Sequence, residues 1–123
     1  MKLIKEEFIM GIGNKETVYD LINKRPIPEG FDPNAPFELE VDKITDTEDT
    51  SVILHGYVKS GVLHIGDKLF IKGSDKVAKV YEIRIHYTDK RIDVKSIRQG
   101  DRVRITVRGI DKYQIKIGTV VYK

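Results

Sequence analysis

Residues 56–73, which read GYVKSGVLHIGDKLFIKG, carry the strongest fold signal in the chain. Short apolar runs in this stretch alternate with turns that contain glycine, namely Lys59-Ser60-Gly61 and Ile65-Gly66-Asp67, and Gly73-Ser74-Asp75 follows directly. Glycine enters the positive φ region that tight turns need at little cost. The stretch therefore predicts short antiparallel strands joined by tight turns.

The same spacing continues through most of the chain. Runs rich in Val, Ile, Thr and Tyr predict six strands, at Phe37–Ile44, Ser51–Val58, Lys68–Ile71, Val77–Tyr87, Arg102–Val107 and Thr119–Tyr122. Alternation along two of them directs apolar side chains inward, and these are Val52, Leu54, Val58, Val103, Ile105 and Val107. This pattern is typical of an antiparallel sandwich or barrel.

The first 35 residues follow a different pattern. Lys5–Met10 predicts a strand, and Asn14 is a candidate N-cap for a short helix with an apolar face. The prolines between residues 26 and 36 then indicate a semi-rigid linker. We therefore predict two parts, an αβ preface with its linker at residues 1–35 and a barrel at residues 36–123.

Composition narrows the function classes. The 123 residues suit one domain and contain no cysteine, so disulfides, thiolate metal sites and thiol nucleophiles are excluded. No apolar run approaches the roughly 20 residues that span a bilayer, and we expect a cytoplasmic protein. His55, His64 and His86 have no metalloprotease spacing, and a nucleophile elbow is absent. We predict no catalytic residue, cofactor or metal, and no enzyme activity.

Charge is divided unevenly along the chain. Residues 1–75 contain 9 basic and 14 acidic side chains, whereas residues 76–123 contain 13 basic and 5 acidic ones. A concentrated positive field attracts phosphates, unless the two halves interleave in space and average it out. Acidic residues alternate along the first predicted barrel strand at Glu38, Glu40 and Asp42. They predict a solvated acidic face. The alternatives are a divalent metal site and ion pairing with the basic half, within one chain or between chains.

A basic stripe is the main candidate site. Alternation places Arg102, Arg104 and Arg108 on the outer face of one strand, and the preceding strand and loop add further cations. Arginine forks bind phosphate bidentately, and Tyr81 or Tyr87 could stack a base. The alternative is a solvated face balanced by nearby carboxylates. The predicted nucleic-acid-binding residues are Arg84, His86, Lys90, Arg91, Lys95, Arg98, Arg102, Arg104 and Arg108.

The quoted stretch resembles the second domain of elongation factor Tu and related translational GTPases. It meets every fixed position of their pattern G-x-V-x-x-G-x-[IL]-x-x-G-[DE]-x-[VL]-x-[IL]-x-G. Gly100-Asp101-x-Val103, Arg108-Gly109-Ile110 and Ile115-x-x-Gly118-x-Val120-Val121 are similar to later elements of that domain, in the right order. The resemblance implies a mostly β, six-stranded antiparallel Greek-key barrel, and RNA, either tRNA or ribosomal RNA, as the substrate class.

Three departures from the family pattern bear on function. A nucleotide-binding P-loop is absent, the turn at residues 47–51 is acidic instead of glycine-rich, and Arg102 and Arg104 stand where the family has small or neutral residues. We expect a non-catalytic module that binds RNA or a ribonucleoprotein through its basic face. The alternative is a protein-interaction module that docks on a GTPase or another protein through Tyr19, Ile27 and Phe31. For Arg108 and Gly109 we favour a structural role.

Overall fold

A computed structural model describes residues 25–47, 49–87 and 90–123. The strands are β1 (Glu38–Asp46), β2 (Val52–Ser60), β3 (Val62–His64), β4 (Lys68–Ile71), β5 (Val77–Tyr87), β6 (Lys90–Val94), β7 (Ser96–Arg98), β8 (Arg102–Arg108) and β9 (Val120–Tyr122), with a 3-10 turn at Lys112–Gln114. Residues 25–36 contain neither helix nor strand. The predicted N-terminal strand and helix lie outside the described residues, so the predicted preface stays a prediction.

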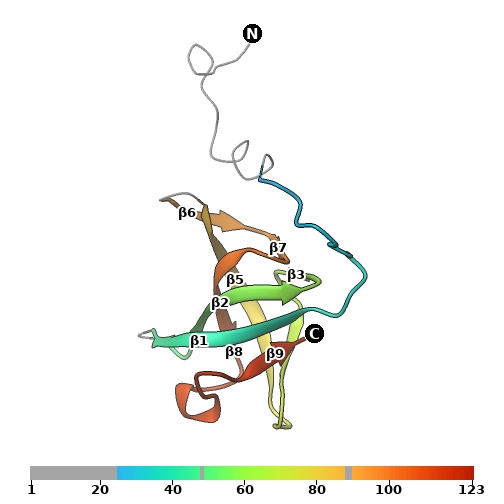
Figure 1. The fold of residues 1–123 in the computed structure, drawn as a ribbon. Helices are drawn as coiled ribbons and strands as arrows, with labels where there is room; N and C mark the ends of the chain where they lie inside the picture. Colours follow the sequence, from blue (N-terminus) through green and yellow to red (C-terminus); the bar gives the residue numbers. More distant parts are fainter. Residues whose placement is uncertain (1–24, 48, 88–89) are drawn as a thin grey trace.

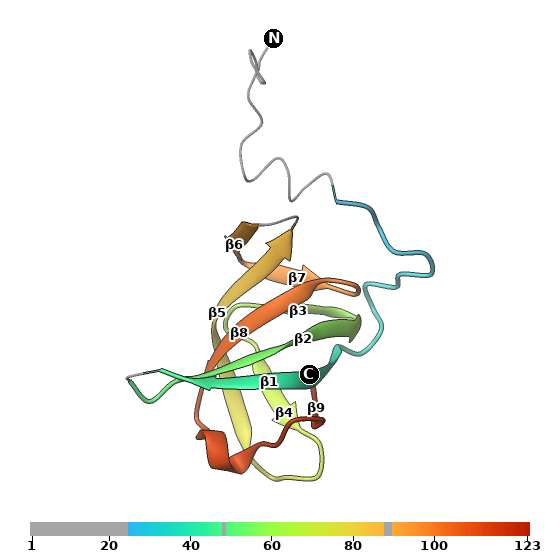
Figure 2. The ribbon, with the colours of Figure 1, turned by 60° about the vertical axis from the view of Figure 1, so that its left-hand side comes forward.

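Six strands close into an antiparallel barrel (Figures 1 and 2). Their order is β4-β9-β1-β2-β8-β5, and a further pairing of β4 with β5 closes the ring, while β6 extends the sheet beyond β5. Strand β8 lies between β2 and β5, and β9 lies between β1 and β4, so chain neighbours are separated as in a Greek key. The predicted fold class is confirmed.

Alternation along the strands builds the core. The inward side chains Leu39, Leu54, Leu69, Ile83 and Ile105 are fully buried, and the other predicted inward residues of β2 and β8 are buried too. All six predicted strands form, with bounds that shift by no more than two residues at either end. The strands β3, β6 and β7 are additional to the six that the sequence predicts.

Beyond the ring, β3 and β7 pair with each other as a separate two-stranded sheet. Leu63 and Ile97, one from each strand, are buried and join the main core. The turn that leads into β3 is tight. A Cβ on Gly61, which has φ +73°, would lie 2.6 Å from the backbone of Ala35 and Phe37. The small sheet therefore follows directly from a turn that only glycine fits.

The described end of the linker is attached to the barrel. Arg25 donates from Nε and Nη2 to the carboxylate of Asp101, at 3.0 and 3.1 Å. Arg98 donates to the carbonyls of Arg25 and Pro26, both at 3.1 Å, and its guanidinium lies 5.9 Å from the ring centroid of Phe31. Asp101 also accepts from the Arg98 amide at 2.9 Å, so one buried carboxylate joins the β7–β8 turn to the linker.

Candidate nucleic-acid interface

Strand pairing arranges the outer face of the barrel into two parallel rows of side chains. In the first row, Arg104 of β8 lies between His55 of β2 and Arg84 of β5, and in the second, Arg102 lies between Tyr57 and His86. The rows continue onto β1 and β6. In strand order the first row is Lys43, His55, Arg104, Arg84 and Asp93, and the second is Glu40, Tyr57, Arg102, His86 and Arg91.

An irregularity in β1 places Lys43 in the first row. The register shifts between Val41, which pairs with Gly56, and Lys43, which pairs with His55, so that Asp42 is the extra residue. Regular alternation from Glu38 and Glu40 would have put an acidic residue beside His55. The predicted continuous acidic face therefore ends at Asp42, and a lysine faces the basic strands instead.

The structure brings five of the nine predicted residues together on this face, and they are Arg84, His86, Arg91, Arg102 and Arg104. Arg108 lies at the far end of β8. Arg98 belongs to β7 and faces the linker, and Lys95 is exposed between β6 and β7. The side chain of Lys90 lies outside the described residues. The predicted residues thus do not form one site: five lie together on the face, Arg108 lies at the end of β8, and Lys95 and Arg98 lie in or next to β7.

Carboxylates neutralise some of these arginines. Arg84 donates to Asp93 at 2.8 Å and lies 4.0 Å from Glu82. Arg102 forms an ion pair with Asp42, and its hydrogen bond lowers the pKa of that carboxyl. The pairs of Arg84 support the alternative of a solvated face balanced by nearby carboxylates, and the pair of Arg102 with Asp42 joins the basic half to the acidic half. The positive field of the face is smaller than the sequence count indicates.

Arg108 is neutralised in a similar way by the acidic turn before β2. It donates from Nε to the Ser51 hydroxyl at 3.2 Å, lies 3.6 Å from Asp49, and stacks 3.9 Å from the ring centroid of Tyr81. Hydrogen bonds from Thr47 and then Ser51 lower the pKa of Asp49 to about 2. These contacts agree with the structural role expected for Arg108.

Arg104 differs from the other arginines of the face. Its Nε is buried and has no hydrogen-bond partner within the described part of the chain. Burial, followed by the charges of Arg91 and Arg84, lowers the pKa of Arg104. A buried donor without an acceptor is costly, since it has lost water and gained nothing in exchange. An anion placed at Arg104 would supply the missing acceptor.

His55 is the functional candidate that the sequence missed. It faces outward from β2 but is only 8% exposed, because neighbouring side chains of its row cover it. Its Nε2 shares a hydrogen bond of 3.0 Å with the Thr45 hydroxyl. Burial and then the charges of Arg104 and Lys43 lower its pKa to about 4, so the ring is neutral near pH 7. Alternation alone gave no signal for this burial.

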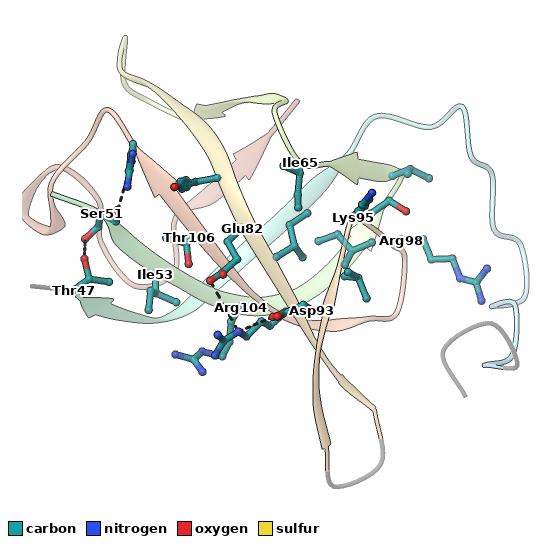
Figure 3. A pocket seen from close by; sticks show the side chains of 18 of the residues that line it. Thr47, Ser51, Ile53, Ile65, Glu82, Asp93, Lys95, Arg98, Arg104 and Thr106 are labelled. Atoms are coloured by element: carbon teal, nitrogen blue, oxygen red, sulfur yellow. Dashed lines mark hydrogen bonds and ion pairs between the residues drawn. The ribbon is translucent and has the colours of Figure 1, made fainter. Parts of the chain in front are cut away.

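A groove with a volume of about 1340 Å³ runs along the basic face (Figure 3). It extends from Thr47 and Ser51 at one end, past Thr106 and Glu82, to Lys95 and Arg98 at the other. Apolar side chains on its floor and wall include Ile53, Ile65 and Val94, and Tyr81 lines it as well. Tyr81, predicted as a stacking platform, is 50% exposed there, whereas Tyr87 has no described side chain. The groove thus combines apolar surface with both signs of charge.

The acidic strand shows no metal site. In the part of the chain that the structure describes, no three His, Asp or Glu side chains come close enough to hold a metal ion. Glu40 pairs with Lys59 at 3.4 Å, and Asp46 pairs with Lys112 at 2.7 Å. The pair of Asp46 with Lys112 joins the acidic half of the chain to the basic half, whereas Lys59 belongs to the acidic half itself. A search of the same residues finds no helix with the length and apolar character of a membrane span.

Comparison with known proteins identifies the barrel. No protein-family model matches the chain. Elongation factor 1-alpha from Metallosphaera sedula is 30% identical over 106 residues, which are 86% of this chain and 22% of that protein. The protein of the same name from Desulfurococcus mucosus is 31% identical over 87 residues, 71% of this chain and 19% of the relative. The chain spans about a fifth of the length of the curated relatives it matches.

Solved structures agree with these relatives. Translation elongation factor SelB from Methanococcus maripaludis superposes with a TM-score of 0.65 at 22% identity, over 83% of this chain and 21% of that one. The structure of Sup35 in complex with GDP superposes with a TM-score of 0.63 at 25% identity, and the match covers 74% of this chain and 21% of that one. The matches fall in the barrel portion of these factors. The chain contains a translation-factor barrel like the second domain of elongation factor Tu and related translational GTPases.

Proposed function

We propose that this translation-factor barrel is a non-catalytic module that binds RNA phosphates through the outer face of β2, β8 and β5. The observation that carries the proposal is the buried Nε of Arg104, which has no acceptor in the described part of the chain and belongs to a strand position between His55 and Arg84. A phosphate oxygen is a strong acceptor for a guanidinium, which binds it through two parallel N–H groups. The binding residues proposed on this face are Arg84, His86, Arg91, Arg102 and Arg104.

The adjoining groove supports single-stranded RNA as the form that is bound. Tyr81 offers a half-exposed ring in a wall that also contains Arg108 and Arg84. Base stacking on aromatic rings is tolerant of sequence, and arginines beside the ring follow the backbone. Since Asp93, Glu82 and Asp49 neutralise part of the groove, we expect few phosphate contacts and moderate affinity. The relatives are elongation factors, which favours RNA of the translation machinery, either tRNA or ribosomal RNA.

The test is fluorescence-anisotropy binding of labelled tRNA and of an unstructured RNA across a salt series. Arg104→Gln removes one charge without breaking an ion pair of the described residues, and Lys76→Gln, in the turn between β4 and β5, removes the same charge elsewhere as a matched control. We expect affinity to fall steeply with salt, and Arg104→Gln to reduce the slope of log K against log salt by about 1. Lys76→Gln should bind like the parent protein.

Absence of RNA binding at low salt would contradict the proposal and favour the protein-interaction alternative. That alternative is supported by Ile27, which is 70% exposed on the linker, and by Phe31 beside it. Tyr19, its third predicted residue, lies outside the described residues. An interface of this kind would show weak salt dependence and would be disrupted by Ile27→Asp. The cytoplasmic location and the absence of enzyme activity stay predictions.

A further inference from the structure

A second, smaller pocket opens on the basic face beside the groove. It has a volume of about 330 Å³, and its wall comes from five strands, β1, β2, β5, β6 and β8. Arg104 borders both spaces. The remaining lining residues belong to this pocket alone, and they are Lys43, Thr45, His55, His86, Arg91, Arg102 and Val103.

Among the described residues, no carboxylate lines this pocket. Lys43, Arg91 and Arg104 form no ion pair with any carboxylate in the described ranges, although Arg102 is paired with Asp42. Arg91 donates instead to His86 Nε2, at 3.1 Å. Three cations without a described carboxylate partner therefore surround one small space. Such an arrangement is unfavourable in the empty protein, because like charges repel and one of them has a desolvated donor.

The charge and size of the pocket select among anions. An internal RNA phosphodiester brings one negative charge and needs room for two ester chains. A terminal phosphomonoester brings ≈ −1.5 to −2 charges at pH 7 and three strong acceptor oxygens, on a single chain. Arg104, Arg91, Lys43 and the Thr45 hydroxyl all line the pocket, and a set of three cations matches the second group. The groove, which has both signs of charge, suits the remaining nucleotides of an RNA chain.

We propose that this pocket binds the terminal phosphomonoester of an RNA strand whose following nucleotides lie in the adjoining groove. The inference rests on the proposed RNA binding and adds to it a preference for phosphorylated ends. Arg104, which borders both spaces, contacts the terminal group, while Tyr81 lines the groove where nucleotides farther along would lie. Lys43 and Arg91 act only on the terminal phosphate, because neither one lines the groove.

The experiment compares three labelled RNAs of one unstructured sequence, with a 5′ phosphate, a 3′ phosphate or hydroxyl groups at both ends. Binding is measured by anisotropy at a fixed, moderate salt concentration, and the His55 ring resonances are followed by NMR. Adenosine monophosphate and adenosine provide the small-molecule arm. Lys43→Gln/Arg91→Gln removes two charges from the pocket. Lys76→Gln/Lys116→Gln removes two exposed charges elsewhere and is the matched control.

We expect one phosphorylated RNA to bind at least tenfold more tightly than the hydroxyl RNA and to shift the His55 resonances. The pocket variant should abolish that difference, and the control variant should keep it. Equal binding of all three RNAs would overturn this inference while the proposed function stands. Absence of binding by any RNA would overturn both. Saturable binding of adenosine monophosphate without RNA binding would overturn the RNA assignment and identify a free nucleotide as the ligand.

Discussion

His55 shows how the surroundings of one side chain change its chemistry. On an isolated strand the ring would titrate near its ordinary pKa of 6.5. In the barrel, burial and the charges of Arg104, Lys43 and Arg102 lower the pKa to about 4, and only Asp42 opposes them. A cationic ring at this place would add a charge to an already positive cluster. Neutral His55 therefore belongs to the native state.

The lowered pKa of His55 predicts a pH dependence of stability. The unfolded chain binds a proton at His55 below pH 6.5, but the folded protein binds it only near pH 4. Stability from this group is therefore complete above pH 6.5 and is lost as the pH falls toward 4, by no more than about 3 kcal/mol. Urea unfolding of the parent and of His55→Gln between pH 4 and 7 measures it. A stability difference that does not change with pH would contradict the assignment.

The close backbone packing around Gly61 predicts a large loss of stability when this glycine is replaced by alanine. A methyl group there would meet the backbone of Ala35 and Phe37 at 2.6 Å, whereas one on Gly66, also at positive φ, would meet no atom within 4 Å. Gly66→Ala should cost about 1 kcal/mol through φ alone, and Gly61→Ala should cost at least about 2 kcal/mol. Chemical denaturation compares the two. Equal losses would mean that the linker moves away at no cost.

At the scale of elements, the linker is held by the β7–β8 turn. Asp101 is 7% exposed and accepts both from Arg25 and from the Arg98 amide. Asn at this position keeps one acceptor for the amide but loses the charge that Arg25 pairs with. Removing one partner of a buried ion pair is expensive, because the other charge stays desolvated. Asp101 therefore contributes one of the contacts that hold residues 25–35, beside those of the Arg98 guanidinium.

Asp101→Asn should release the linker from the barrel. We expect faster cleavage after Glu29 by a glutamate-specific protease, and a loss of about 2 kcal/mol in the free energy of unfolding. Asp111→Asn, in the turn before β9, is a control that also removes one carboxylate charge. Cleavage at the parent rate in Asp101→Asn would show that the ion pair does not hold the linker.

At the scale of the whole molecule, the short strand β9 completes the ring. It pairs with β1 on one side and with β4 on the other, and Val121 is fully buried opposite Leu39 and Ile71. Val120, next to it, is half-buried on the other face. Closure leaves the barrel proper without an edge strand. Three residues thus join segments that lie more than 30 positions apart.

Val121→Asp should therefore prevent the barrel from closing, because it places an unpaired charge in the core. We expect loss of cooperative unfolding in thermal circular dichroism for Val121→Asp. Val120→Asp, the same change one residue earlier, should melt cooperatively with a smaller loss of stability. Cooperative melting of Val121→Asp near the parent temperature would show that β9 is dispensable for closure.

Much of the barrel could be read from local sequence, because alternation and turn glycines act over a few residues. The three turn glycines predicted from the quoted stretch and its continuation, at positions 61, 66 and 73, all adopt positive φ. The strands β3, β6 and β7 lie outside the six that alternation predicts. The basic site could be predicted only in part, since alternation gave the direction of Arg102 and Arg104 but no indication of their partners.

The sequence alone determined six strands, their inward faces, the family resemblance and the excess of cations from residue 76 onward, because these depend on local order and composition. Only the tertiary structure decided which cations are neutralised. Asp42 reaches Arg102 across 60 positions of sequence, and the register shift at Asp42 brings Lys43 beside His55. The Nε of Arg104 is buried without an acceptor among the described residues. Electrostatic partners depend on distances in space, and these are set only when the barrel closes.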